Sequence, residues 1–413
     1  MTAKNTGKTA LAALCLCAML AGCSSVSDSF NNFLENDANI GKNAPAVMGT
    51  VSEIVTSDTS AAVTEAQTAA EEAFEKQTKR AEEIVSGMTV GEKIGQLLLA
   101  RCPDDPVQVM EQYYLGGFTL YAEDFEDKSP EDIKSLTADI AKAAKTAPFI
   151  AVDEEGGTVV RVSKFTQFRD EPFSSPQLLF NRGGTELLSI DGREKARLLL
   201  GLGINFNLAP VADISTNEDS YIYPRTLGQG AESTSEGIRA IVETADNMGL
   251  ASCLKHFPGY GENTDTHTGS AHDSRELYEL QSRDFLPFEA GINATEDKTP
   301  AVMTGHTIYD NIDPDTPASL SAVIHAELRD KLSFDGVIMT DDMGMDAAAE
   351  YSGDVSPYVA AILADNDLLC VTDHETAYGD ITAAYNEGVI TDEMLELHAV
   401  RVVRMKLQYG IIH

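Results

Sequence analysis

The segment from Lys255 to His267 (KHFPGYGENTDTH) concentrates side chains that could do chemistry. It holds a lysine, two histidines and two carboxylates together with two glycines and a proline. It directly follows residues 249–254, an apolar run that is typical of a buried strand. Ionisable groups on a glycine-rich loop at the end of a strand are typical of active sites in α/β enzymes. The alternative is a polar loop whose histidines have no function.

Asp265 and His267 in this segment form a candidate proton-transfer pair. One residue separates them, so on an extended loop both side chains face the same way and the carboxylate can orient the imidazole. Such a histidine can act as general acid and then as general base near neutral pH. The alternative is a metal site, which would use His256, Asp265, His267 and His272. Their irregular spacing, without a helical i, i+4 histidine pair, disfavours a metal, and we expect no cofactor.

A second candidate site lies at Asp341 and Asp342, which end the apolar run 336–340. Successive side chains of a strand point to opposite faces, so we expect only one of the two carboxylates to point inward. An aspartate on a rigid strand end can act as a nucleophile or stabilise charge. The other aspartate could cap or orient the following loop, and a helix N-cap is the alternative for either residue.

The remaining sequence predicts a framework that would bring these segments together. Eight apolar runs are expected to be strands: 94–100, 117–122, 149–153, 204–210, 250–255, 301–306, 336–341 and 367–372. Amphipathic segments expected to be helices lie between them, at 129–144, 193–202, 235–247, 274–290 and 321–332. Apolar strands alternating with helices indicate a parallel sheet covered on both faces. We therefore predict an α/β fold, a (β/α)8 TIM-type barrel with a single catalytic domain, and a doubly wound sheet is the alternative.

Charged residues at the predicted strand ends support the barrel. They are Asp153-Glu154-Glu155, Asp213, Lys255-His256, His306, Asp341-Asp342 and Asp373-His374. In a barrel these residues converge at the C-terminal mouth, where such enzymes place their active sites.

The N-terminal residues have the composition of a secretion signal and a tether. Residues 1–22 read as a signal peptide, and Leu20-Ala21-Gly22-Cys23 resembles a bacterial lipobox, which would make Cys23 the lipidated first residue. An ordinary secretory signal is the alternative. Residues 23–64 lack apolar periodicity and indicate a flexible tether, 65–87 a helix, and 88–413 the barrel.

Composition limits the partners of the protein. The formal net charge of −36 argues against nucleic acid and against electrostatic attachment to anionic membranes, so membrane attachment would come from the lipid. Cys102, Cys253 and Cys370 are scattered, without a disulfide or zinc pattern, and we expect inert thiols. We expect a monomer.

Five segments in order resemble glycoside hydrolase family 3, in its β-N-acetylglucosaminidase branch. The loop from Lys255 to His267 resembles the signature K-H-F-P-G-H-G followed by D-S-H, and 337–342 resembles the nucleophile motif. The other three are 88–97, 152–157 with Arg161, and 206–213 with Arg225. The resemblance thus runs from about Met88 to near the C-terminus.

The resemblance implies residue roles and a reaction. Asp341 would be the nucleophile and His267 the acid/base, with Asp265 as its partner. The residues that bind a terminal GlcNAc would be Asp153, Arg161, Arg225, Lys255 and His256. The implied reaction is a retaining double displacement, and the implied substrates are cell-wall muropeptides or chito-oligosaccharides on the outer face of a bacterial membrane. For Arg161 and Arg225 a salt bridge at the barrel rim is the alternative.

Two departures from the family signature stand in the loop. Tyr260 replaces its second histidine and Thr266 its serine. The chain also has no tryptophan, so any stacking on a sugar must come from Tyr or Phe. The remaining alternatives are a family 3 β-glucosidase or broad β-hexosaminidase, and a non-catalytic lipoprotein that binds wall sugars.

Overall fold

Eight short parallel strands form the centre of the structure, a computed structural model that describes residues 69–261, 271–345, 348 and 355–413. The strands are β1 (Leu98–Arg101), β2 (Gly117–Leu120), β3 (Phe149–Val152), β4 (Phe206–Asn207), β5 (Ala251–Phe257), β7 (Ala301–Thr304), β10 (Ile338–Thr340) and β11 (Leu369–Val371). Their order in the sheet is β10-β7-β5-β4-β3-β2-β1-β11. A parallel bridge between Met339 and Leu368 brings the two outer strands together, so the sheet is nearly closed. This closure confirms the predicted barrel and rules out the doubly wound sheet.

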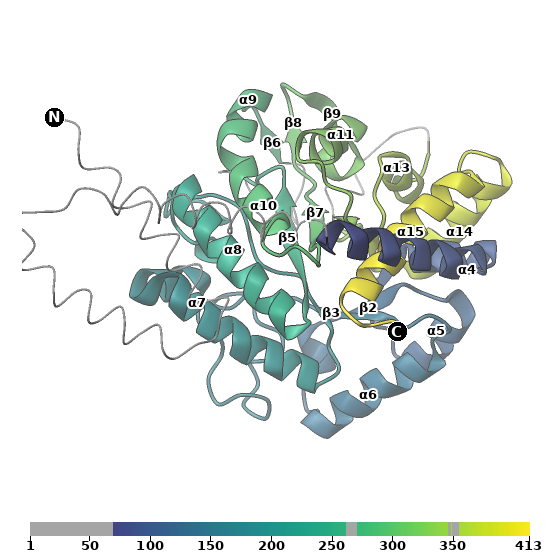
Figure 1. Ribbon diagram of the computed structural model, residues 1–413, viewed down its shortest axis with the longest axis horizontal. Helices are drawn as coiled ribbons and strands as arrows, with labels where there is room; N and C mark the ends of the chain where they lie inside the picture. Colours follow the sequence, from purple (N-terminus) through teal and green to yellow (C-terminus); the bar gives the residue numbers. More distant parts are fainter. Residues whose placement is uncertain (1–68, 262–270, 346–347, 349–354) are drawn as a thin grey trace, which may run out of the picture. The chain divides into compact units, whose positions relative to one another are not determined.

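A helix follows each strand of the barrel (Figure 1). In chain order these are α5 (Pro106–Tyr113), α6 (Pro130–Ala143), α7 (Pro176–Gly201), α8 (Ala231–Met248), α10 (Phe285–Ile292), α11 (Ala322–Ala326), α13 (Pro357–Leu363) and α14 (His374–Asn386). Their starts are encoded locally: Ser129 and Asp132, for example, form a capping box at the start of α6. Two further helices, α4 (Val90–Gln96) and α15 (Asp392–Gln408), are joined by an ion pair of 2.6 Å between Lys93 and Glu396.

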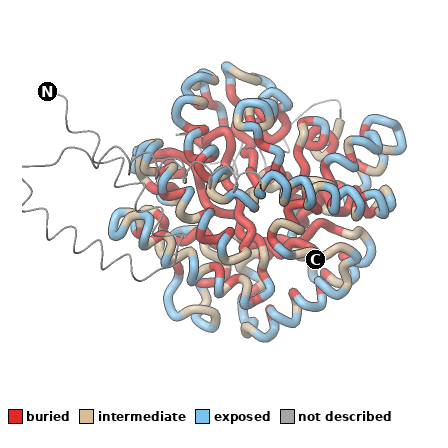
Figure 2. The backbone as a smooth tube through the Cα atoms, viewed as in Figure 1, coloured by how far each residue is buried: buried red, intermediate tan, exposed pale blue. Residues whose placement is uncertain are grey.

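Alternation along the strands divides the core into an inner and an outer layer. Leu99, Phe149, Ala151, Cys253 and Met339 belong to one buried cluster, which the C-terminal part of α15 joins through Val402 and Met405. The intervening strand residues, such as Leu98, Ile150 and Leu254, pack in other clusters, with the surrounding helices. Figure 2 shows this buried interior in red beneath an exposed helical surface. The period of two places strand-end residues of the inner series at the mouth of the barrel.

The helix at 69–86 packs on the barrel through its buried residues Ala81 and Val85. The guanidinium of Arg404 on α15 lies 4.2 Å from the centre of the Phe74 ring of this helix. All described residues belong to one compact unit, Ala66–His413. None of its described helices is long and apolar enough to cross a membrane. Residues 1–22 and 23–64, including Cys23, lie outside the described residues.

The structure corrects some element boundaries. The run 94–100, predicted as one strand, begins in α4 and becomes β1 only at Leu98, because Thr89 and Glu92 form a capping box that starts a helix. The predicted helix 193–202 is the C-terminal part of the longer α7, which contains non-helical residues at Gly183 and Gly184. A small second sheet of β6 (His272–Asp273), β8 (Ile308–Tyr309) and β9 (Asp313–Pro317) was not predicted.

Candidate active site

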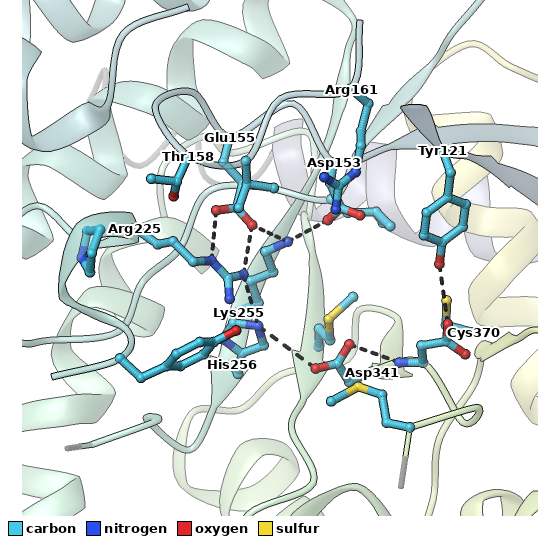
Figure 3. A pocket seen from close by; sticks show the side chains of 17 residues that line it. Tyr121, Asp153, Glu155, Thr158, Arg161, Arg225, Lys255, His256, Asp341 and Cys370 are labelled. Carbon is cyan, nitrogen blue, oxygen red and sulfur yellow. Dashed lines mark hydrogen bonds and ion pairs between the residues drawn. The ribbon is translucent and has the colours of Figure 1, made fainter. Parts of the chain in front are cut away.

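A cavity of about 580 Å³ opens at the mouth of the barrel. Its lining includes Tyr121 after β2, Asp153 after β3, Lys255 within β5, Asp341 after β10 and Cys370 within β11. Tyr121, Asp153, Lys255 and Asp341 all continue the inward-pointing series of their strands. Figure 3 shows these side chains converging from separate strands. The alternation that builds the core therefore also assembles the site.

Two cations and two carboxylates form a cluster on one side of the cavity, in which Lys255 and Glu155 are buried and Asp153 and Arg225 half-buried. Lys255 Nζ donates to Asp153 Oδ1 at 2.6 Å and lies 2.7 Å from Glu155 Oε1. Arg225 donates to both oxygens of Glu155, from Nε at 3.0 Å and from Nη2 at 2.8 Å. Arg225 thus forms a salt bridge, which was the alternative to its predicted role in binding sugar, but both members of this ion pair line the cavity.

Charge pairing sets the ionisation of this cluster. Burial alone would raise the pKa of Glu155, but the charges of Lys255 and Arg225 outweigh it and hold that pKa far below its ordinary value. Burial alone would lower the pKa of Lys255, but Asp153 and Glu155 hold it above its ordinary value. Glu155, Lys255 and Arg225 are therefore charged at neutral pH, and the cluster presents fixed donors and acceptors to a ligand.

Glu155 is a site residue that sequence reasoning missed. Its only signal was its place in the acidic run 153–155 at a strand end, where all three acids looked alike. The structure separates them: Asp153 and Glu155 line the cavity, whereas Glu154 is fully buried and accepts the backbone N–H groups of residues 161–163. Glu154 thereby shapes the loop that carries Arg161 into the cavity lining. Within the described residues, the buried Nε of Arg161 has no hydrogen-bond partner.

His256 is oriented by Asp213, a second residue absent from the predicted site. Asp213 Oδ2 lies 2.8 Å from His256 Nδ1 and also accepts the His256 backbone N–H at 3.1 Å. Since the carboxylate can only accept, Nδ1 carries a proton and Nε2 faces the cavity. The other oxygen of Asp213 accepts the backbone N–H of Tyr260 at 2.6 Å. Asp213 thus fixes both the imidazole and the start of the loop that follows β5.

Asp341 lies opposite this cluster, with its Oδ2 3.9 Å from His256 Nε2 (Figure 3). Its other oxygen accepts the backbone N–H of Asp342 at 2.9 Å, and its own N–H donates to the Thr304 carbonyl at 3.0 Å. Burial alone would raise the pKa of Asp341, but His256, His306 and the Asp342 amide more than offset it, so the pKa lies below its ordinary value. Asp341 is therefore an ionised, rigidly held carboxylate, as a nucleophile requires.

Asp342 and His306 hold the backbone next to Asp341. The Asp342 carboxylate accepts the Gly344 N–H at 2.9 Å and the Tyr121 hydroxyl at 3.3 Å, so it shapes the turn after β10. His306 Nε2 donates to the Asp342 carbonyl at 3.0 Å, while Nδ1 lies 2.7 Å from the Ser319 hydroxyl. Burial lowers the pKa of His306, which leaves the ring neutral at pH 7. His306 was recognised only as a strand-end charge in the sequence.

Asp265 and His267, the predicted proton-transfer pair, lie outside the described residues. Of the four residues of the alternative metal site, His256 and His272 are described, and each pairs with a separate carboxylate, Asp213 and Asp310 respectively. Among the described residues, one group could share an ion, namely Asp365, Asp367 and His398. Arg329 and Arg401 already donate to Asp367 at 2.7 and 3.2 Å, so its charge is balanced without a metal.

Comparison with known proteins supports a sugar-processing site. The chain matches the glycosyl hydrolase family 3 N terminal domain over residues 89–405. It is 32% identical over 302 residues to a beta-hexosaminidase of Hydrogenovibrio crunogenus, in an alignment covering 70% of this chain and 80% of the relative. A beta-hexosaminidase of Alkalilimnicola ehrlichii is 33% identical over 267 residues, or 64% of this chain and 75% of the relative.

A solved structure agrees with these relatives. The glycoside hydrolase family 3 beta-N-acetylglucosaminidase of Paenibacillus sp. str. FPU-7 aligns with a TM-score of 0.72 and 26% sequence identity. The alignment covers 79% of this chain but 63% of that chain, less than two thirds of its length.

Proposed function

The chain belongs to glycoside hydrolase family 3, and from this premise we propose that it is a retaining, exo-acting β-N-acetylglucosaminidase. The observation that carries the proposal is the position of Asp341. It is an ionised carboxylate at the mouth of the barrel, opposite a cluster of fixed polar groups. The names of the family relatives supply the sugar class, since both relatives described above are beta-hexosaminidases.

The polar cluster would hold the terminal sugar. Asp153 can accept from sugar hydroxyls, while Lys255, Arg225 and Arg161 can donate to hydroxyls or to the acetamido oxygen. Lys255 and Glu155 are only 2% and 3% exposed, so this side of the cavity is closed by protein. A closed end admits the end of a glycan rather than its middle, which supports exo-action.

The reaction would proceed in two displacements. Asp341 attacks the anomeric carbon and forms a glycosyl ester, while a general acid protonates the departing oxygen. Water then attacks the same carbon and releases Asp341. The general acid, which lost its proton in the first step, now acts as a base and accepts the proton of the water. Retaining enzymes commonly use a second carboxylate for proton transfer. We propose His267, oriented by Asp265, for that role on the basis of the loop's resemblance to the family motif.

Two synthetic substrates test this function. Turnover of p-nitrophenyl β-GlcNAc, with the β-anomer of GlcNAc seen first by NMR, supports the proposal. Turnover of p-nitrophenyl β-glucose instead would indicate a β-glucosidase, and turnover of neither would indicate a sugar-binding protein. The Asp341→Ala variant serves as the inactive control.

We further propose attachment of a monomer to the outer face of a bacterial membrane through a lipid on Cys23, with muropeptides or chito-oligosaccharides as substrates. The lipobox resemblance of residues 20–23 supports the anchor. Metabolic labelling with a radioactive fatty acid tests it: the wild type should incorporate label and a Cys23→Ser variant should not. Label in both proteins would exclude Cys23 as the attachment site.

Light scattering after size-exclusion chromatography would test whether the protein is a monomer, and the mass of a dimer would refute this.

A further inference from the structure

The cavity changes character from its closed side to its mouth. The closed side consists of the ion-paired groups Lys255 and Glu155, which are almost fully buried. Tyr221, an aromatic residue of the cavity lining, is 40% exposed and therefore lies toward the mouth. It comes shortly before the short 3-10 helix η2 (Tyr223–Arg225), whose Arg225 reaches the buried cluster. One loop therefore supplies both a charged group for the closed side and an aromatic surface for the mouth.

Tyr221 is held in place by a second tyrosine. Its ring lies 5.9 Å from the ring of Tyr260, centre to centre, with 35° between the planes. Tyr260 is only 4% exposed and contacts the His256 ring edge-on at 5.5 Å. The backbone of Tyr260 and the ring of His256 are both bound to Asp213. Packing thus fixes Tyr221 relative to His256 and, through it, to Asp341.

This packing indicates a role for Tyr260, the residue that departs from the family signature. Tyr260 stands where the signature K-H-F-P-G-H-G has its second histidine. In this chain the residue supplies a buried aromatic ring that packs against Tyr221. The chain has no tryptophan, and of the two tyrosines in the described cavity lining, Tyr121 and Tyr221, the second is the more exposed.

We propose that Tyr221 forms the subsite for the sugar ring on the leaving-group side of the bond that is cut. This inference rests on the proposed exo-glycosidase function. When the terminal sugar fills the closed side of the cavity, the next ring must lie near the mouth. The C–H groups of a pyranose make one of its faces apolar, and a flat, exposed aromatic ring gives that face a large contact area. Tyr221 would therefore favour saccharide leaving groups over small alcohols.

The test compares two substrates that share the terminal sugar. N,N′-diacetylchitobiose carries a sugar as leaving group, and methyl β-GlcNAc carries only methanol. The readout is the ratio of kcat/KM for the disaccharide to kcat/KM for the methyl glycoside. Tyr221→Leu should lower this ratio about 3- to 10-fold, or about 0.7 to 1.4 kcal/mol, the usual size of an aromatic contact. Tyr221→Phe should keep the ratio within about twofold, because the ring face remains.

A matched control separates this effect from loss of any exposed tyrosine. Tyr278, in the short helix α9 (Leu277–Glu279), is 67% exposed and is not among the cavity-lining residues. Tyr278→Leu should leave the ratio unchanged. An unchanged ratio in Tyr221→Leu, with both substrates cleaved, overturns the subsite but not the glycosidase. A wild type that cleaves neither substrate overturns the proposed function and the subsite together.

Discussion

Replacing Glu155 with glutamine should disrupt the polar cluster that we expect to bind the sugar. The Glu155 carboxylate receives two hydrogen bonds from Arg225 and lies 2.7 Å from Lys255 Nζ. Glutamine keeps one acceptor oxygen, and its NH2 group would face a cation. The buried Lys255 and the half-buried Arg225 would keep their positive charges with one negative charge fewer between them.

The cost follows from the burial of these groups. Removing one partner of a buried ion pair typically costs about 3 to 5 kcal/mol, because the remaining charge is uncompensated. For a unit of this size we expect the melting temperature to fall by roughly 4 to 7 °C. We also expect kcat/KM to fall at least about tenfold. Misplacement of Lys255 and Arg225 that costs about 1.4 kcal/mol of transition-state stabilisation is enough for that change.

Thermal unfolding followed by circular dichroism measures the first effect and steady-state kinetics the second. Glu131→Gln is the matched control, because Glu131 pairs with Lys134 at 3.6 Å on the exposed surface of α6. Exposed pairs contribute about 0 to 1 kcal/mol, so this variant should melt within about 2 °C of the wild type. If Glu155→Gln melts like Glu131→Gln and keeps its kcat/KM, the reasoning about the cluster is wrong.

The same pairing predicts a pH dependence. Because the pKa of Glu155 is lowered in the folded state, its contribution to stability is present above its unfolded pKa of about 4.5. That contribution is lost as the pH falls through the folded pKa. The free energy of unfolding of the wild type should therefore decrease more steeply below about pH 4.5 than that of Glu155→Gln. Parallel pH profiles would contradict this.

Three further predictions concern other parts of the chain. His267→Ala should lower kcat about 10²- to 10⁴-fold, the usual effect of acid/base catalysis, and an unchanged kcat would exclude His267. Burial lowers the pKa of Lys406 to about 7, so the wild type should gain about 2 kcal/mol in unfolding free energy between pH 7 and 9 relative to Lys406→Met. The unfolding free energies come from urea titrations at each pH. Equal changes between pH 7 and 9 in the two proteins would show that Lys406 is charged in the folded state. A shortened chain beginning at Glu65 should be soluble and fully active, and loss of turnover would show that residues 1–64 contribute more than a tether.

The framework was predictable because it follows from local patterns. All eight predicted strand runs overlap a barrel strand, since apolar runs bounded by turn residues encode buried parallel strands. The period of two also places Asp153, Lys255 and Asp341 in one series of inward-facing positions. The first run was assigned too long because a short amphipathic helix and a strand follow each other without a break there.

The partners within the site were not predictable in the same way. Asp153, Glu154 and Glu155 are consecutive acids, and only the tertiary structure decides that the first and third pair with Lys255 while the second binds backbone amides. Asp213 and His256 lie 43 residues apart, and nothing in either segment specifies their hydrogen bond. The role of Tyr260 required its neighbour Tyr221, which carried no signal in the sequence.

In the proposed reaction, Asp341 forms a covalent bond to the anomeric carbon of a terminal GlcNAc. The direct test is to trap that intermediate with 5-fluoro-N-acetylglucosaminyl fluoride, whose ring fluorine slows its hydrolysis, and to locate the added mass by tandem mass spectrometry. We predict one added sugar on the peptide that contains Asp341, at that side chain, and none in Asp341→Asn. A sugar on another residue, or inactivation without any added mass, would contradict the account.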